Sequence, residues 1–299
     1  MCILTTKRKP RADMNTLLTL FFVVMFEITT LMATAQTHTL GLIAQPQYDS
    51  LLYASGFRLT GRTVESLLGP KVSNAEFQAH VKSLHQLKCN VYVCNVLFPG
   101  SIKIAGPDVD QHEVLSYLEA VLVRAQHAGI KNLTLGSGGA RRLPPGYDAT
   151  IAKTRFIELS KQMAALAKKY AVTIILENLN STETNFINTL RDATDIVKRV
   201  DHPNFRLNAD IYHMLKEREL PEAIENAKGL IVYCEIAESQ KRSLPGVHGE
   251  DFRPYFAALK NIGYEGPIMI EGNVDNLTKD APIAFRYLQS QLREVWEKK

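Results

Sequence analysis

The feature that most constrains the fold of this chain is a regular alternation of short apolar runs with longer amphipathic stretches. The alternation starts after residue 36 and continues to the C-terminal region. In the longer stretches the apolar residues recur at helical spacing, whereas the short runs have the length and composition of buried strands. Strands that alternate with helices in this way are typical of a parallel sheet built from βα units.

The chain contains eight of these units. The predicted strands are residues 39–43, 57–60, 90–96, 132–135, 173–177, 205–208, 230–236 and 268–271. The predicted helices are residues 75–87, 110–128, 150–170, 189–200, 221–227, 252–262 and 283–296. No Pro-rich or Ser-rich linker divides the units, which favours one closed barrel over an open sheet with a second domain. We therefore predict an α/β protein with a single (β/α)8 TIM barrel over residues 36–299.

The first 35 residues have a different pattern. A basic stretch at 7–11 precedes an apolar run at 17–32, and small residues at 33–35 come just before Gln36. This order is typical of a secretory signal peptide, here cleaved after Ala35. A buried or membrane-spanning helix is the alternative, but Glu27 interrupts the run and its apolar length is marginal for a bilayer. We expect a periplasmic or secreted protein with no stable membrane insertion after cleavage.

Charge and cysteine content exclude two classes of protein. The formal charge is +4, and the first 35 residues contribute half of it, so no basic nucleic-acid footprint is indicated. The chain after residue 36 holds Cys89, Cys94 and Cys234, an odd number without the spacing of a disulfide framework. We expect these three cysteines to be buried as small apolar side chains.

Four acidic residues lie at or just after the ends of the later predicted strands: Glu177, Asp210, Glu235 and Glu271. In a (β/α)8 barrel the C-terminal strand ends form the active site, so these carboxylates should converge. One such acid alone could be a solvated rim residue or a helix cap. Four together would repel one another unless a divalent cation neutralises them, and oxygen ligands suit Mg²⁺ or Mn²⁺ better than Zn²⁺.

Other polar residues fall in the predicted mouth loops. Glu183 and His213 follow the fifth and sixth strands, and each could hold a substrate hydroxyl. His213 could equally be a helix cap. The glycine-rich segment 136–142 ends in Arg141 and Arg142, which could meet an anionic or polyhydroxylated ligand. It lacks the Lys-Ser/Thr of a phosphate-binding P-loop, and a tight turn is the alternative.

Several motifs together resemble the sugar phosphate isomerase/epimerase family of xylose-isomerase-like barrels, which includes the D-tagatose 3-epimerases. The resemblance spans about residues 55–272. It is carried by segments 95–99 (Asn-Val-Leu-Phe-Pro), 136–142, 177–185, 210–213, 236–238 and 263–266, the last leading to Glu271. The motifs occur in the order in which the family has them.

The resemblance implies a sugar isomerase or epimerase in which Glu177 and Glu271 transfer protons on opposite faces of the substrate through an enediolate. It also implies that these two acids and Asp210 bind a divalent metal, Mn²⁺ or Mg²⁺, which helps proton removal beside a carbonyl. The expected contacts of a small carbohydrate substrate are Asn95, Arg141, Glu183, His213, Glu238 and either Lys241 or Arg242.

Two segments depart from the family pattern. The seventh strand has Tyr-Cys-Glu at 233–235 where the family typically has His-x-His. Glu235 could replace the metal-binding His, or metal affinity could be lost; His248 is a further alternative, although it falls in a predicted outer turn. The second strand lacks the Glu that relatives often place after Gly-Phe, since Gly56-Phe57 leads here to Arg62.

Three other functions are consistent with some of these features. Export favours a free sugar or an oxidised glycoside over a phosphorylated sugar, and the same site would suit β-elimination by a 3-keto-glycoside lyase. A non-catalytic sugar-binding barrel is a second alternative. A phosphodiester hydrolase that cuts DNA is disfavoured, because only His213 and His248 lie near strand ends. Assembly into a homo-oligomer is left open.

Overall fold

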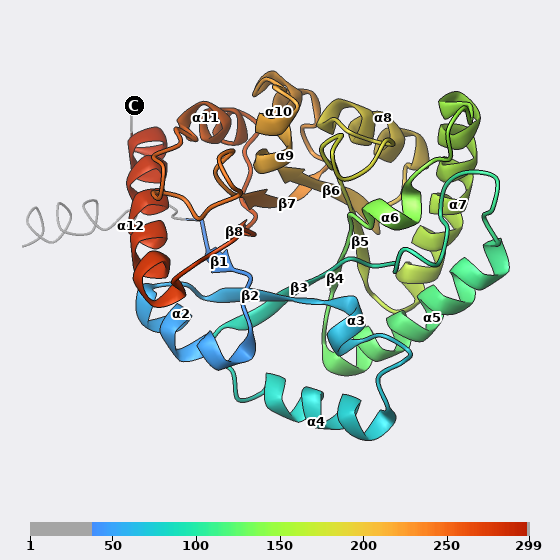
Figure 1. The fold of residues 1–299 in the computed structure, drawn as a ribbon, viewed down its shortest axis with the longest axis horizontal. Helices are drawn as coiled ribbons and strands as arrows, with labels where there is room; N and C mark the ends of the chain where they lie inside the picture. Colours follow the sequence, from blue (N-terminus) through green and yellow to red (C-terminus); the bar gives the residue numbers. More distant parts are fainter. Residues whose placement is uncertain (1–37, 298–299) are drawn as a thin grey trace, which may run out of the picture. The chain divides into compact units, whose positions relative to one another are not determined.

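The computed structural model describes residues 38–297, so the predicted signal peptide lies outside the described residues. Eight parallel strands pair in chain order, and the last pairs with the first to close a barrel (Figure 1). The strands are β1 (Leu40–Leu42), β2 (Leu59–Thr63), β3 (Asn90–Asn95), β4 (Asn132–Leu135), β5 (Thr173–Glu177), β6 (Phe205–Asp210), β7 (Ile231–Ile236) and β8 (Ile268–Ile270). The predicted (β/α)8 barrel is thereby confirmed.

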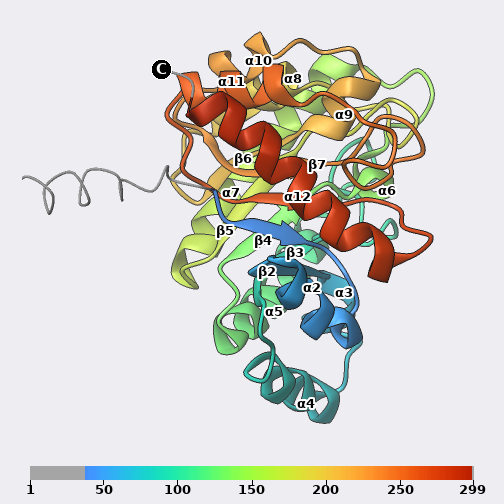
Figure 2. The ribbon, with the colours of Figure 1, turned by 90° about the vertical axis from the view of Figure 1, so that its left-hand side faces the viewer.

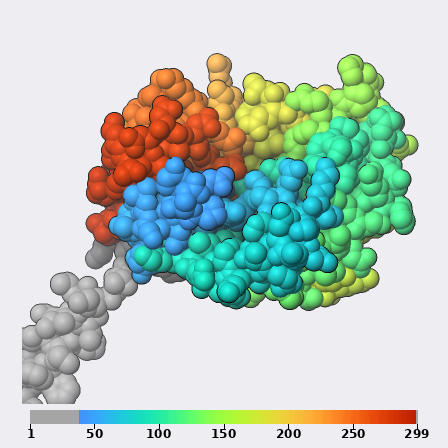
Figure 3. Space-filling model, turned by 60° about the horizontal axis from the view of Figure 1, so that its bottom comes forward, coloured from blue at the N-terminus to red at the C-terminus, as the bar shows by residue number. Residues whose placement is uncertain are grey.

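Long helices surround the barrel on its outer face, and several short helices lie in its loops (Figure 1). They are α2 (Asp49–Ser55), α3 (Val64–Leu67), α4 (Asn74–Leu84), α5 (Gln111–Ala128), α6 (Gly138–Arg141), α7 (Ala149–Lys169), α8 (Leu190–Val200), α9 (Ile211–Lys216), α10 (Glu222–Asn226), α11 (Arg253–Asn261) and α12 (Leu277–Trp296), with a 3-10 turn, η1, at Pro46–Tyr48. Helix α12 contacts both α11 and α2, and it crosses the outside of the barrel in Figure 2. In the space-filling view its red surface adjoins the blue surface of the first units (Figure 3). This contact closes the helical layer. None of the described helices is long and apolar enough to cross a bilayer.

Local sequence explains where the long helices begin and end. The side chain of Asp110 accepts hydrogen bonds from the first free N–H groups of α5, and Gly129 ends the helix in the left-handed conformation. Ser73 and Glu76 form a reciprocal capping box at the start of α4. Caps of this kind fix the length of each βα unit, and with it the position of the strand that follows.

A small apolar cluster fills the interior of the barrel. Val93, Ile175, Tyr233 and Met269 are fully buried there, separate from the larger core between strands and helices. The Tyr233 hydroxyl donates a hydrogen bond of 3.0 Å to Glu235. The interior is therefore packed solid below the C-terminal strand ends, and Tyr233 forms part of the floor on which polar chemistry can be placed.

The structure differs from the sequence prediction in a few elements. The second strand lies at Leu59–Thr63 and not at 57–60, because pairing with β3 extends it through polar residues as far as Thr63. Helix α12 starts at Leu277 and not at 283, since Asn276 caps it and the helix continues through Pro282. The short helices α2, α3, α6 and α9 were not predicted. Cys89, Cys94 and Cys234 are free and buried, as predicted.

Candidate functional site

Four carboxylates meet at the C-terminal ends of β5 to β8. Glu177 and Asp210 are the last residues of β5 and β6, Glu235 is the penultimate residue of β7, and Glu271 follows β8. One oxygen of each carboxylate lies within 4.8 Å of one oxygen of every other. Three of the four are nearly or fully buried, and the Glu271 side chain is 27% exposed. The chain thus gathers four potential negative charges in one small volume.

This crowding affects the ionisation of the acids. Burial, followed by the charges of neighbouring acids, raises the pKa of Glu177 and of Glu235 well above the ordinary carboxyl value. Burial also raises the pKa of Glu271, although Arg242 opposes the shift. Full ionisation of the cluster is unfavourable without additional positive charge.

Glu235, on the strand that departs from the family pattern, is held by three hydrogen-bond donors. Its Oε1 accepts bonds from Asn95 Nδ2 (2.9 Å) and the Tyr233 hydroxyl (3.0 Å), and its Oε2 accepts a bond from Asn208 Nδ2. A carboxylate oxygen has two lone pairs, so Oε1 is saturated and Oε2 retains one. Glu235 can therefore offer a cation a single lone pair, on Oε2.

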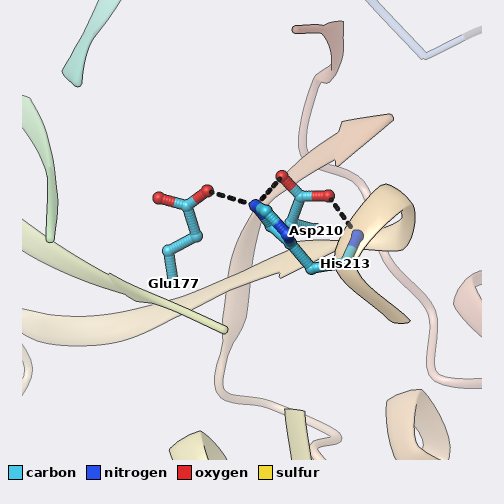
Figure 4. Close-up of side chains that lie close together, drawn as sticks. All are labelled: Glu177, Asp210 and His213. Atoms are coloured by element: carbon cyan, nitrogen blue, oxygen red, sulfur yellow. Dashed lines mark hydrogen bonds and ion pairs between the residues drawn. The ribbon is translucent and has the colours of Figure 1, made fainter. Parts of the chain in front are cut away.

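His213, at the start of α9, faces two of the acids (Figure 4). Its Nε2 lies 3.6 Å from Glu177 Oε1 and 3.5 Å from Asp210 Oδ2. Its Nδ1 accepts a hydrogen bond of 3.1 Å from the main-chain N–H of Asn180. Because Nδ1 uses its lone pair as an acceptor, the neutral ring carries its proton on Nε2. That Nε2–H is buried and has no hydrogen-bond partner among the described residues.

The tautomer of His213 decides which residues could hold a metal. Two groupings have ligand atoms close enough: Glu177 and Asp210 with His213, or the four carboxylates. A protonated Nε2 has no lone pair for a cation, so the four carboxylates are the donor set that fits. Oxygen-only ligation of this kind would suit Mg²⁺ or Mn²⁺, the ions that the sequence analysis expects.

Arg242 covers the acid cluster on the side of Glu271. Its guanidinium donates a hydrogen bond to Glu271 Oε2 and lies 3.3 Å from Glu183 Oε1. The Arg242 side chain is also stacked over the ring of Tyr212, at 4.7 Å from its centroid. Burial alone would lower the pKa of Arg242, but Glu271 and the other acids raise it above its ordinary value. Of the two candidates, Lys241 and Arg242, Arg242 is the one that contacts the acids. The Lys241 side chain is exposed and forms no hydrogen bond with the described residues.

A cavity of about 280 Å³ opens above these residues. Its lining includes Asn95, Gly136, Glu177, Glu183, Arg242 and Glu271. Asn95 donates hydrogen bonds to both Glu235 and Glu271, and so ties the two acids together. A Cβ atom at Gly136 would overlap Glu177 Oε2, so a larger residue there would displace the Glu177 carboxylate. The cavity therefore gives a small ligand access to both Glu177 and Glu271.

Arg141 and Glu238 do not take the places expected of substrate contacts. The Arg141 guanidinium is fully buried and donates to the main-chain oxygens of Leu135, Glu177 and Ile187, and burial lowers its pKa to about 10. Arg141 therefore stabilises the end of β5 through its bond to Glu177, and it does not line the cavity.

Glu238 and His248 belong to a loop beside the site. The buried Glu238 carboxylate accepts hydrogen bonds from the Ser243 hydroxyl and from the main-chain N–H groups of 246 and 248–250. It therefore organises this loop internally. His248 is exposed and meets Glu238 through its main-chain N–H, so its imidazole does not replace the missing family His.

Sequence reasoning missed three residues of the site. Asn208 and Tyr233 hold Glu235, and Asn180 fixes the tautomer of His213. A polar Asn208 inside an apolar strand was a usable signal, since buried polar side chains need partners. Nothing in the local sequence distinguishes Tyr233 from an ordinary core aromatic.

Comparison with known proteins identifies the family. A family model described as "Xylose isomerase-like TIM barrel" matches residues 56–291. The chain belongs to the xylose isomerase-like TIM barrel family. An L-ribulose 3-epimerase from Methylomonas sp. (strain DH-1) is 33% identical to this barrel over 128 residues, which is 42% of the chain and 44% of that protein. The chain thus matches less than half of the length of this curated relative.

Solved structures show the same fold for this xylose isomerase-like barrel. A D-psicose 3-epimerase from Clostridium cellulolyticum H10 superposes with a TM-score of 0.71 at 18% identity, covering 86% of the chain and 99% of that structure. A 3-keto-D-glucoside 4-epimerase from E. coli superposes with a TM-score of 0.70 at 19% identity, covering 85% and 100%.

Proposed function

We propose that this protein is a divalent-metal-dependent sugar epimerase or isomerase that moves a proton on a carbon next to a carbonyl group. The observation that carries the proposal is the convergence of four carboxylates from four consecutive strands within 4.8 Å. The similarity to an L-ribulose 3-epimerase supports a sugar as the substrate.

Glu177 and Glu271 are the proposed proton-transfer pair. Both line the cavity, and they come from strands on different sides of the mouth. Burial raises the pKa of each carboxyl, which brings it closer to the range in which one group both accepts and returns a proton near neutral pH. One would remove the proton from one face of the substrate, and the other would return a proton to the opposite face.

Neutral and cationic donors around the pair would orient the sugar. The Nε2–H of His213 has no hydrogen-bond partner among the described residues and lies 3.6 Å from Glu177 Oε1, so it can donate to a substrate oxygen. Arg242 and Glu183 lie at the rim on the side of Glu271 and can bind hydroxyl groups. Fixing the substrate between two acids in this way lowers the entropic part of the barrier.

A divalent cation would be held by Glu177, Asp210, Glu235 and Glu271. When bound, it would supply Lewis-acid polarisation of the carbonyl and the adjacent hydroxyl of the substrate. Mn²⁺ and Mg²⁺ are the proposed ions, because all the donors are oxygen atoms. The same cation would offset the mutual repulsion of the four acids.

Solvent deuterium exchange tests the proposal. The full-length protein with Mn²⁺ is incubated in D2O with a panel of ketoses and 3-keto-glucosides, and exchange is followed by NMR. We expect exchange and isomer formation with wild type, and loss of both in Glu177→Gln and in Glu271→Gln. Glu113→Gln, an exposed acid on α5, is the matched control and should retain exchange. Exchange that survives in both site variants would refute the assignment.

The products separate this function from its alternatives. A 3-keto-glycoside lyase would also exchange the proton but would release the aglycone, which chromatography detects. A non-catalytic sugar-binding barrel would bind a sugar without exchange. Export through residues 1–35 remains a proposal as well, and expression with a tag after residue 299 followed by cell fractionation tests it.

A further inference from the structure

A second cavity adjoins the acid cluster and has no role in the chemistry described above. It has a volume of about 390 Å³ and lies over the ends of β1 and β2 and the segment after β8. Gly272, the residue after Glu271, lines both cavities. The two cavities therefore share a wall at Gly272, next to Glu271.

Arg62 is the cationic residue of this second cavity. It lies near the end of β2, next to the hydroxyl-bearing residues Thr63 and Ser66, which also line the wall. Its side chain is half-buried, and it forms no hydrogen bond or ion pair with any residue between 38 and 297. Burial lowers the pKa of its guanidinium. A half-buried cation without a charged partner in the wall can pair with an anionic ligand that enters the cavity.

The residues that line the cavity do not supply an anion that pairs with Arg62. Asp275 is the single acid among the residues that line the cavity, and it lies too far from Arg62 to form an ion pair. The charge of Arg62 therefore remains available to a ligand.

The rest of the cavity is mainly apolar. Tyr48 and Val274 line it and are 38% and 39% exposed, a high value for large apolar side chains. Leu244 and Leu277 form its buried part. An apolar wall with an aromatic ring and a few convergent polar groups is the usual composition of a small-molecule site.

We propose that this second cavity binds the non-reacting part of the substrate, and that Arg62 pairs there with a carboxylate or phosphate group. The substrate is then an anionic glycoside, with its sugar ring at the acid cluster and its acidic aglycone or second ring between Arg62 and Tyr48. This inference rests on the proposed function, and it specifies the substrate class. Binding of a remote group provides energy that positions the reacting ring.

Three related probes test the inference by isothermal titration calorimetry on the full-length protein with Mn²⁺. They are phenyl, 4-carboxyphenyl and 4-phosphonophenyl β-D-glucopyranoside, which share the glucosyl and phenyl rings and differ in the para substituent: none, a carboxylate or a phosphonate. A charge-assisted hydrogen bond to Arg62 should make one or both acidic probes bind roughly ten-fold or more tightly than the neutral probe. The two acidic probes distinguish a carboxylate from a phosphate.

Variants identify the residue responsible. Arg62→Gln should abolish the preference for acidic probes and leave the affinity for the phenyl probe nearly unchanged, and Arg62→Lys should retain part of it. Arg206→Gln is the matched control, because Arg206 is also half-buried on a strand but lines neither cavity. Equal binding of all three probes, no binding of any of them, or a preference that persists in Arg62→Gln would overturn the inference.

The same probes separate this inference from the proposed function. Binding is measured without turnover, so a preference that depends on Arg62 would stand even if no sugar exchanged deuterium. Exchange that requires Glu177 and Glu271, together with no preference among the probes, would leave the function intact and exclude the anionic substrate.

Discussion

Glu235→Gln is the substitution that tests the acid cluster most directly. Glutamine has the shape of glutamate, and its side-chain oxygen can keep the hydrogen bonds from Asn95 and Tyr233. Its amide nitrogen would face Asn208, whose Oδ1 is buried without a partner among the described residues. A flip of the Asn208 amide pairs the two groups, so we expect the fold to be retained and one charge to be lost.

The structure gives the sign and size of two opposite effects. Two charged carboxylates 4.8 Å apart repel by about 3 kcal/mol at an effective dielectric constant of 20. At a pH where both acids are ionised, removing one such repulsion should raise the Tm of the metal-free protein by up to about 10 °C, since 1 kcal/mol corresponds to roughly 2–4 °C in a domain of this size. Loss of a ligand should weaken Mn²⁺ binding by at least about 100-fold, because loss of an outer partner alone costs 10–100-fold.

The assay compares thermal unfolding in chelator and in Mn²⁺ with calorimetric titration of the ion. The metal-free Tm should rise in Glu235→Gln while the stabilisation by Mn²⁺ shrinks. Glu183→Gln removes a carboxylate outside the four-acid group and should leave the Mn²⁺ affinity within a few-fold of wild type. Unchanged Mn²⁺ affinity in Glu235→Gln would refute ligation by Glu235, and a lower metal-free Tm would refute the charge crowding.

Other perturbations follow from the same geometry. Burial raises the pKa of Glu177 and of Glu235 above the ordinary 4.5, so the folded state binds more protons than the unfolded state, and the Tm of metal-free protein should fall as pH rises above about 4.5. Gly136→Ala should lower the deuterium exchange rate about 100-fold by displacing Glu177, with little loss of secondary structure in circular dichroism. Tyr233→Phe removes a donor to Glu235 and should weaken Mn²⁺ binding roughly 10-fold in calorimetry. Arg141→Met leaves buried carbonyls unpaired and should destabilise the fold by about 3 kcal/mol in urea unfolding.

The barrel and the candidate acids could be predicted from the sequence because both depend on local pattern. An apolar run ends where a polar residue reaches the mouth, so a strand end such as Glu177 can be recognised in the sequence. The position of each acid along the barrel axis could not be predicted in this way. The register between β6 and β7 shifts between Leu207 and Asn208, and this shift places Asp210 directly opposite Glu235. A bulge of this kind depends on two strands at once, and no single run of sequence contains it.

Side-chain direction limited the prediction of substrate contacts. An Arg in a glycine-rich loop and a Glu after a strand are both typical of ligand contacts, yet both side chains bond to main-chain groups: Arg141 to the end of β5, and Glu238 to its own loop. Whether a charged side chain faces the cavity or folds back depends on the loop backbone, which composition does not determine. Arg242 shows the converse, since it reaches the acids from a left-handed main-chain conformation next to Lys241, which shares that conformation but remains exposed.

The seventh strand has Glu235 where the sequence resemblance implies a His, and the residues around Glu235 match the additional charge. A neutral ring at this position would need no compensation, whereas an additional carboxylate needs donors or a cation. Asn95, Asn208 and Tyr233 supply three donors to Glu235, and Arg242 neutralises Glu271 beside it. These partners leave one lone pair on Glu235 Oε2 that is free to bind a cation. Under the proposed function, a site with four acidic donors and no imidazole ligand would favour a hard ion over Zn²⁺, and Glu235 of the seventh strand would contribute to that preference.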